Sequence, residues 1–263
     1  MSQRRVLITG AGSGLGLALA LRYARSGARV ACVDLIQDRV DTACANLPGQ
    51  GHIALLADVG SDDSMQTLFD QVQKEWGGVD VLINNAGIAS GGAMTETTMA
   101  EWRKLLEVDL LSVVRGCRLF LPGMLAAGKG QILSTASFAG LAGAPGIMSY
   151  GVAKAGVVAL SEQLRAEVYD KGVSVGVICP SFFRTNLIDS MVGSDKVGKM
   201  ALKLMDNSPD TVDSVADKVF KAAERGKFLI IPTKREPMLW RLKRWFPSIY
   251  FKVLTHVAKS KMK

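Results

Sequence analysis

Short apolar runs alternate along the chain with longer stretches in which apolar residues recur every three or four positions. The first pattern is typical of buried strands and the second of amphipathic helices. The predicted strands cover residues 4–9, 29–34, 52–57, 79–84, 130–135, 173–179 and 227–231. The predicted helices cover residues 14–26, 62–76, 97–125 and 149–170. This alternation predicts right-handed strand–helix–strand units and a parallel sheet.

The region that follows is less regular. Residues 181–207 carry scattered apolar side chains without a clean period. Ser208 and Pro209 then supply a helix N-cap and a first-turn proline, and Gly226 is expected to end that helix. We therefore expect an α/β fold in a single domain, residues 1–233, built on a doubly wound parallel sheet of about seven strands with helices on both faces.

Composition is typical of a globular protein, with 48% hydrophobic and 21% charged residues among 263 positions. The four cysteines show no paired spacing, and Cys32 and Cys179 lie inside apolar runs, so we expect them to be buried core residues. No leader segment precedes the first expected strand, and no apolar run reaches the ~18 residues that a membrane span requires. A cytoplasmic location is expected.

The net charge of +8 resides in residues 234–263, which we call the basic tail. The tail contains nine Lys or Arg residues and one acidic residue, Glu236, whereas basic and acidic residues balance in the rest of the chain. A general nucleic-acid surface would need positive charge spread over the folded domain. We therefore expect no nucleic-acid partner.

A glycine-rich turn, TGAGSGLG, connects the first expected strand to the first expected helix. Glycines let a backbone turn sharply and approach a pyrophosphate, whose charge faces the helix N-terminus. Its place between a strand and a helix predicts a Rossmann-like dinucleotide site. The expected residues of this site are Gly10, Ser13, Gly14, Leu15 and Gly16.

Asp34 ends the second expected strand, eighteen residues after Gly16. A carboxylate at this position accepts hydrogen bonds from an adenosine ribose diol and repels a 2′-phosphate. The next residue is Leu35 rather than an arginine. NAD(H) is therefore favoured over NADP(H).

Tyr150 and Lys154 are four residues apart on an expected helix, so they project from the same face. A phenol has a pKa near ~10 in water, and a neighbouring ammonium lowers it toward the range useful for proton transfer. Ser137 adds a hydroxyl that can hydrogen-bond to a substrate oxygen. The Tyr/Lys spacing alone is common in amphipathic helices, so the other motifs must decide its meaning.

Together these motifs resemble the short-chain dehydrogenase/reductase family from about residue 6 to residue 185, with looser similarity to residue 231. Ser137, Tyr150 and Lys154 match the catalytic residues of that family at its separations. Cofactor-contacting positions of the family are matched by Asp58, Val59, Asn85, Ala86, Gly87, Pro180 and Thr185.

The resemblance implies hydride transfer between a nicotinamide cofactor and a substrate carbon that carries an alcohol or carbonyl oxygen. It gives Tyr150 the proton exchange with that oxygen, and gives Ser137 the orientation of the substrate. Lys154 would lower the pKa of Tyr150 and hold the nicotinamide ribose. The resemblance also implies a homodimer or homotetramer assembled through the helices at 97–125 and 149–170. No metal site is expected.

Two positions depart from the family pattern. Asp109, in Val108-Asp109-Leu110, replaces an asparagine that takes part in a proton relay. Its carboxylate can accept from a water or from the lysine and adds negative charge beside the site; alternatively, it is a helix residue paired with a neighbouring cation. Ser181 replaces the glycine that commonly follows Pro180, which makes that loop less permissive for a positive φ.

Residues 181–207 match the substrate lid of the family. Apolar and methionine-rich lids suit a lipophilic alcohol or ketone, although ordinary packing of a flap helix would give the same composition. The apolar residues of this segment are Phe182, Phe183, Leu187, Ile188, Met191, Val192, Met200, Leu204 and Met205.

The basic tail is expected to form two amphipathic helices separated at Pro247. Its aromatic and basic residues fit an interfacial membrane helix, and they also fit packing on a second subunit, on the site mouth or on the chain itself. The apolar stripes are Leu239, Leu242, Trp245 and Phe246, followed by Ile249, Tyr250, Val253, Leu254 and Val257.

The sequence thus favours an NAD(H)-dependent oxidoreductase acting on an alcohol or carbonyl group. The alternative from another class is a non-catalytic dinucleotide-binding sensor or scaffold of the same fold. The presence of Ser137, Tyr150 and Lys154 together argues against that alternative. A third interpretation, a membrane-surface adaptor, depends on the basic tail alone.

Overall fold

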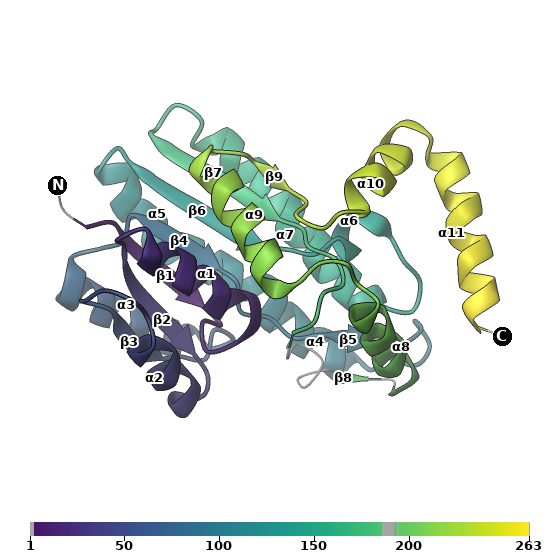
Figure 1. Cartoon of the computed structure of the whole chain (residues 1–263), viewed down its shortest axis with the longest axis horizontal. Helices are drawn as coiled ribbons and strands as arrows, with labels where there is room; N and C mark the ends of the chain where they lie inside the picture. Colours follow the sequence, from purple (N-terminus) through teal and green to yellow (C-terminus); the bar gives the residue numbers. More distant parts are fainter. Residues whose placement is uncertain (1–2, 186–191, 194, 263) are drawn as a thin grey trace.

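A seven-stranded parallel sheet forms the centre of the computed structural model, which describes residues 3–185, 192–193 and 195–262 (Figure 1). Side chains of residues 192–193, 195–196 and 257–262 are not described. The strands follow the order β3-β2-β1-β4-β6-β7-β9. Their bounds are β1 Arg5–Thr9, β2 Arg29–Asp34, β3 Ile53–Leu56, β4 Val81–Asn84, β6 Gly130–Thr135, β7 Val173–Ile178 and β9 Leu229–Ile230. The predicted α/β fold with about seven parallel strands is confirmed.

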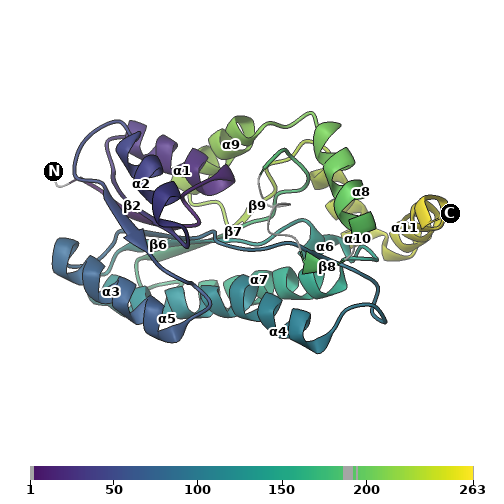
Figure 2. The same cartoon turned by 90° about the horizontal axis from the view of Figure 1, so that it is seen from below.

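Helices cover both faces of the sheet, which Figure 2 shows from its edge. One layer contains α1 (Gly14–Arg25), α2 (Gln37–Ala45) and α9 (Val212–Glu224). The other contains α3 (Asp62–Trp76), α5 (Ser112–Ala126) and α7 (Met148–Glu167). Because side chains alternate along a strand, Val6 and Ile8 enter the first core while Leu7 enters the second. The central strands are buried on both faces, as their apolar sequences predict, whereas the edge strand β3 is partly exposed.

The order of the strands changes direction between β1 and β4. Strands β2 and β3 extend the sheet on one side of β1, whereas β4, β6, β7 and β9 extend it on the other. Loops that follow β1 and β4 therefore leave the sheet in opposite directions and open a crevice at the carboxyl ends of these strands. This crevice is where a ligand site is expected.

Several local elements differ from the sequence expectation. The helix predicted over 97–125 begins at α4 (Met99–Leu106), continues through a π-helical turn (Glu107–Leu111) and joins α5. The helix expected from Ser208 and Pro209 begins instead at Val212, because Thr211 and Ser214 form a reciprocal capping box. Elements that were not predicted are α2, α6 (Ala139–Ala142), α8 (Asp195–Asp206), β5 (Ser90–Gly91) and β8 (Val192–Gly193).

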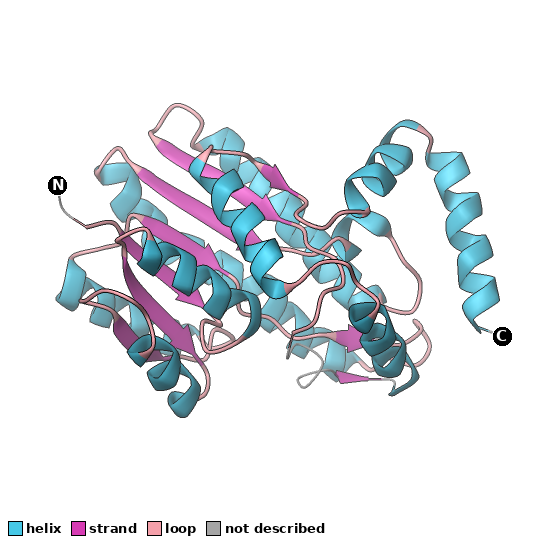
Figure 3. Cartoon of the chain, in the orientation of Figure 1, coloured by secondary structure: helices cyan, strands magenta, loops and turns pink. Residues whose placement is uncertain are grey.

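The basic tail forms α10 (Glu236–Trp245) and α11 (Pro247–Met262), so the predicted division at Pro247 is confirmed. Figure 3 shows the two helices projecting from the body of the fold beyond the last strand. Within the described ranges, no helix is long and apolar enough to cross a membrane. Cys32 and Cys179 are buried free thiols, as expected.

Candidate active site

Glycines allow the turn between β1 and α1 to fold tightly against the neighbouring chain. Gly10 and Gly14 have φ angles of +67° and +55°, which disfavour other residues. A Cβ on Gly16 would collide with the carbonyl oxygen of Gly10, and one on Gly12 would lie 2.7 Å from Asp34 Oδ2. The turn is therefore a narrow backbone cradle at the carboxyl end of β1.

The N-terminus of α1 lacks the side-chain cap that α3, α4 and α9 possess, and α2 and α7 lack one as well. Ser13 occupies the N-cap position without a side-chain hydrogen bond, and the first turn contains no acidic residue. By contrast, Ser61, Thr98 and Thr211 cap α3, α4 and α9 through their hydroxyls. Unpaired N–H groups at a helix N-terminus favour a bound anion. The cradle and the uncapped helix together fit a pyrophosphate.

Asp34 is fixed at the edge of this cradle by backbone donors. The N–H of Gly12 donates to Oδ2 at 3.0 Å, and the N–H of Ile36 donates to Oδ1 at 3.2 Å. These bonds hold the carboxylate at the end of β2, beside the glycine turn. Its position fits recognition of a ribose diol by a charged acceptor.

The segment after β4 is held to the glycine turn by a threonine that the sequence analysis did not single out. Thr9 Oγ1 accepts hydrogen bonds from the N–H groups of Asn85 (2.9 Å) and Ala86 (3.0 Å). Asn85 Nδ2 donates to the Thr9 carbonyl, and Thr135 Oγ1 donates to Asn85 Oδ1 at 3.2 Å. Thr9 and Thr135 are polar residues at the last positions of two predicted strands, and this pattern in the sequence could have indicated their role.

Two further pairs predicted to contact the cofactor surround this region. Asp58 Oδ1 accepts from the N–H of Gly60 at 2.8 Å, while Val59 is buried in the second core. The carbonyl of Pro180 accepts from the N–H of Phe138 at 2.7 Å. Thr185 lies beside the glycine turn, because a Cβ built on Gly14 would be 3.6 Å from its Cβ. Pro180 and Thr185 lie on the loop after β7, so they approach the crevice from a different strand than the segments that follow β1 and β4.

Lys154 carries a buried ammonium group at the centre of the site, with a side chain only 4% exposed. Its Nζ donates to the carbonyl oxygen of Thr135 at 3.2 Å and lies 3.4 Å from Asp109 Oδ2. It also lies 5.8 Å from the centroid of the Tyr150 ring, within the range of a cation–π contact. The i, i+4 spacing on α7 does place Tyr150 and Lys154 on one face.

Asp109 is an ion-pair partner rather than a surface helix residue. It is fully buried in the π-helical turn, and its Oδ1 accepts from the N–H of Ile88 at 2.8 Å. A Cβ on Gly87 would approach Asp109 Oδ1 and Lys154 Nζ, both at 3.1 Å, so glycine leaves room for the pair. Burial raises the pKa of Asp109, and the ammonium of Lys154 opposes that increase. Of the two alternatives weighed from sequence, the contact fits the first, because the carboxylate lies beside the ammonium of Lys154 and adds negative charge next to Tyr150.

The pKa of Tyr150 is raised, which differs from the decrease expected from Lys154 alone. Burial of the phenol is the largest cause, because it disfavours the phenolate. Lys154 lowers the pKa as expected, but the carboxylate of Asp109 raises it again. A hydrogen bond with Ser137 also favours the phenolate. The i, i+4 spacing predicts the direction of the lysine effect on this pKa, whereas the burial that outweighs it arises only in the folded structure.

Ser137 is buried where β6 ends and α6 begins. Its Oγ accepts from the N–H of Ala139 at 3.1 Å and donates to the Pro180 carbonyl at 3.4 Å. The second bond is long, so this hydroxyl can turn toward another acceptor at little cost. The structure thus brings Ser137, Tyr150, Lys154 and Asp109 together at the carboxyl ends of β4 and β6.

The expected lid is only partly described. Phe183 and Met205 are buried, with Phe183 in the first core, whereas Phe182 and Met200 are exposed. Strand β8 pairs with β5, which carries this segment across the chain that follows β4. Leu187, Ile188 and Met191, together with the side chain of Val192, lie outside the described residues.

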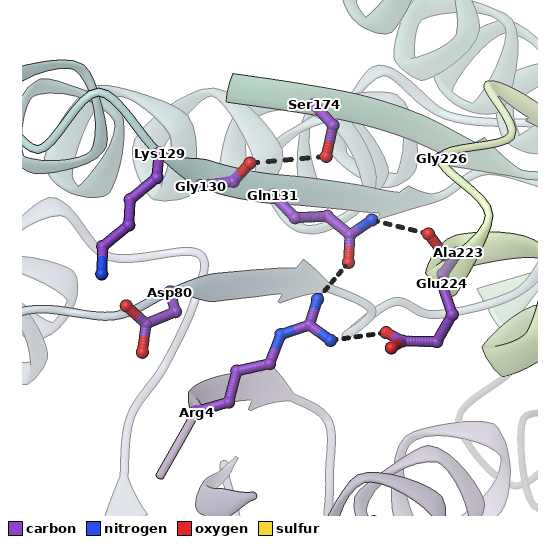
Figure 4. Close-up of a pocket in the computed structure, with 9 residues that line it drawn as sticks. All are labelled: Arg4, Asp80, Lys129, Gly130, Gln131, Ser174, Ala223, Glu224 and Gly226. Atoms are coloured by element: carbon purple, nitrogen blue, oxygen red, sulfur yellow. Dashed lines mark hydrogen bonds and ion pairs between the residues drawn. The ribbon is translucent and has the colours of Figure 1, made fainter. Parts of the chain in front are cut away.

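A separate cavity of about 380 Å³ lies at the amino ends of the strands (Figure 4). Arg4 Nη2 donates to Gln131 Oε1 at 2.9 Å, and Gln131 Nε2 donates to the Ala223 carbonyl at 2.9 Å. These residues belong to the amino ends of the strands and to the end of α9, far from the crevice. The cavity is lined by Arg4, Asp80, Lys129, Gly130, Gln131, Ser174, Ala223, Glu224 and Gly226. It is not part of the candidate site.

Known proteins share both the sequence pattern and the fold. The family model described as short chain dehydrogenase matches residues 4–194. A meso-2,3-butanediol dehydrogenase from Serratia marcescens is 37% identical over 182 residues, which cover 69% of this chain and 72% of that protein.

Two solved structures resemble the whole fold. A short-chain dehydrogenase/reductase from Burkholderia phymatum, in complex with NAD, has a TM-score of 0.87 at 25% identity and covers 94% of this chain and 95% of its own. A short-chain dehydrogenase from Sphingobium yanoikuyae, in complex with NADPH, has a TM-score of 0.78 at 26% identity, with coverages of 98% and 94%. Sequence, fold and the order of the site motifs agree, and the protein belongs to the short-chain dehydrogenase/reductase family of oxidoreductases.

Proposed function

We propose that the protein is an NAD(H)-dependent oxidoreductase that interconverts a secondary alcohol and a ketone, with Tyr150 as the acid/base. The observation that supports this proposal is the contact of the buried Lys154 with Asp109 and with the half-buried Tyr150, in a fold that also contains the glycine cradle. A nicotinamide dinucleotide, when bound, supplies or accepts the hydride. Residues of this chain move the proton, stabilise the phenolate and orient the substrate.

The proton moves at Tyr150 Oη. In alcohol oxidation the phenolate accepts the proton of the substrate hydroxyl, and in carbonyl reduction the phenol returns it. The ammonium of Lys154 stabilises the phenolate without entering the bond changes, since it is held by Thr135 and Asp109. Ser137 donates a hydrogen bond to the substrate oxygen and keeps its proton, and Lys154 would also hold ribose hydroxyls, as the family resemblance implies.

The preference for NAD(H) is supported by Asp34. Its two oxygens are fixed by the N–H groups of Gly12 and Ile36, so the carboxylate cannot swing away without losing both bonds. A 2′-phosphate would place at least one negative charge beside this carboxylate. Relatives of this fold are found with NAD and with NADPH, so the choice belongs to residues such as Asp34 rather than to the fold.

A lipophilic substrate is supported by the segment that follows β7. Phe182, Met200 and Leu202 expose apolar side chains in the region expected to form the lid. Exposed apolar side chains of this kind gain free energy when an apolar ligand covers them. We therefore assign residues 181–207 to a substrate lid and the larger part of the chain, residues 1–233, to cofactor binding and catalysis.

Assembly into a homodimer or homotetramer remains a prediction. The long helices at 97–125 and 149–170 expose Met99, Leu111 and Val152, which supports a contact between subunits there. The non-catalytic sensor remains the alternative function. Cofactor binding without turnover of any alcohol or ketone would favour it.

Replacement of Tyr150 by Phe tests the assignment of the acid/base. We expect Tyr150→Phe to lower kcat by about 10²- to 10⁴-fold, because the ring stays and the proton carrier is lost. Cofactor affinity, measured by fluorescence titration, should change little. Tyr169→Phe is the matched control, because Tyr169 is 82% exposed at the end of α7. Substantial turnover by Tyr150→Phe would contradict the proposal.

Replacement of Asp34 by Ala tests the cofactor preference. The variant should lose about 10- to 100-fold in kcat/KM with NAD(H), since a hydrogen bond to a charged group is worth about 1.5–3 kcal/mol. Its kcat/KM with NADP(H) should rise, because the repulsion of a 2′-phosphate is removed. Asp38→Ala, on the first turn of α2, is the control. An unchanged ratio of the two cofactors would refute the role of Asp34.

Replacement of Asp109 by Asn tests how the ion pair sets the pH dependence. The negative charge of Asp109 raises the pKa of Tyr150, so its removal should lower that pKa. Oxidation requires the phenolate, and the rising limb of kcat/KM against pH should therefore move to lower pH. Thermal unfolding of the same variant reports any loss from leaving Lys154 less compensated. A rising limb at the same pH would show that this charge does not act on Tyr150.

A series of straight-chain secondary alcohols tests the substrate class. Each additional methylene that the lid covers contributes about 0.8 kcal/mol, so kcat/KM should rise about threefold to fourfold per carbon until the site is filled. Steady-state rates with the series and with small polyols measure this slope. Efficient turnover of polyols alone would exclude a lipophilic substrate.

A further inference from the structure

The basic tail is attached to the fold at the segment that follows Ser137. Helix α10 packs against α6, and α11 packs against α10. Lys243 Nζ donates to the carbonyl oxygen of Leu141, and the hydroxyl of Tyr250 donates to the carbonyl of Ala142 at 3.0 Å. At the start of the tail, the N–H of Lys234 donates to Asp210 Oδ2 at 2.9 Å. The tail is thus anchored rather than loosely appended.

Apolar side chains nevertheless remain uncovered on this anchored unit. Trp245 is 74% exposed and Phe251 is 64% exposed, and Phe246, Ile249 and Val253 are also exposed. On α11, Tyr250 is buried and Leu254 is half-buried. The apolar residues on either side of them, which we call the flanks of α11, are exposed: Ile249, Phe251 and Val253. Figures 1 and 2 both show α11 extending away from the sheet and its covering helices. An exposed apolar patch of this kind indicates a docking surface.

Charge decides which occupant suits this surface. The tail holds nine basic residues and one acidic residue, and the rest of the chain is balanced. Arg241, Arg244 and Lys252 are exposed around the apolar side chains. Two tails facing each other in a symmetric dimer would bring like charges together, with only Glu236 from each copy to compensate them. A partner that complements both the apolar side chains and the positive charge has an apolar interior and an anionic surface.

We propose that the basic tail docks the protein onto an anionic lipid surface. Trp245, Phe246 and the exposed flanks of α11 enter the boundary between headgroups and acyl chains, where amphipathic aromatic rings are favoured. Arg241, Arg244 and Lys252 contact the anionic headgroups, each contributing about a fivefold increase in binding. The helices lie in the interface and do not cross it, consistent with the length of α10 and α11.

Docking through this surface brings the candidate active site close to the lipid. The hydrogen bonds of the tail end on Leu141 and Ala142, at most five residues after Ser137. Figure 2 shows α10 at the same end of the fold as α6, α8 and β8. A lipophilic substrate would then reach the site from the lipid phase, but the docking itself is independent of the reaction.

Co-sedimentation of the full chain with vesicles tests the proposal. We expect binding to vesicles of phosphatidylcholine containing about one third phosphatidylglycerol, weak binding to phosphatidylcholine alone, and a decrease with added salt. Substitution of both Arg241 and Arg244 by Gln should reduce the partition coefficient about 25-fold. Substitution of both Trp245 and Phe246 by Ser should reduce it at least tenfold.

Matched controls use exposed residues outside the tail. Tyr169→Ser removes an aromatic ring that is 82% exposed, and Lys171→Gln removes an exposed charge from the opposite end of the sheet. Both should bind vesicles as the unaltered chain does, and circular dichroism should show all variants folded.

Three outcomes would overturn the proposal. The first is no binding of the unaltered chain to anionic vesicles, and the second is equal binding by the tail variants and the controls. The third is found by sedimentation velocity without lipid. If the unaltered chain is an oligomer that does not bind vesicles, and the variant with both Trp245 and Phe246 replaced is a monomer, the surface contacts a second copy of the chain instead.

Discussion

The site depends on how the ammonium of Lys154 is accommodated away from water. Moving the charges of Lys154 and Asp109 into the protein costs several kcal/mol for each ion. Their mutual attraction, the Thr135 carbonyl and the face of Tyr150 offset this cost. At 3.4 Å and an effective dielectric constant of about 20, the attraction to Asp109 is about 5 kcal/mol. The two effects are of similar size, so the pair is tolerated rather than strongly stabilising, and its value lies in the field that it imposes on Tyr150.

That field acts in two directions. The ammonium favours the phenolate, whereas the carboxylate that compensates the ammonium disfavours it, and burial disfavours it most. An amide in place of Asp109 would accept from the lysine without carrying charge. The chain therefore pairs the lysine with an opposite charge and makes the tyrosine less acidic. The π-helical turn that carries Asp109 is the local structure that places this charge in the core.

Charge is distributed unevenly between the body of the fold and the basic tail. Basic and acidic residues balance over residues 1–233, while the tail concentrates the entire net charge beside exposed aromatic rings. Hydrogen bonds from Lys243 and Tyr250 to successive carbonyls of α6 connect this charged unit to the chain that follows Ser137. The proposed lipid-binding surface and the candidate active site thus lie close together in the structure, although the residues that join them are about a hundred positions apart in the sequence.

By itself the sequence determined the alternation of strands and helices, the glycine turn, and the pairing of Tyr150 with Lys154 on one helix face, because each of these follows from local spacing. It did not predict the short elements α6 and β8 or the start of α9 at Val212, because few residues and competing caps decide them. Only the tertiary structure showed that Thr9 and Thr135 hold the Asn85 segment and that Asp109 reaches Lys154. Those contacts join separate strands and helices, and the balance of burial against charge at Tyr150 exists only once the core has closed around it.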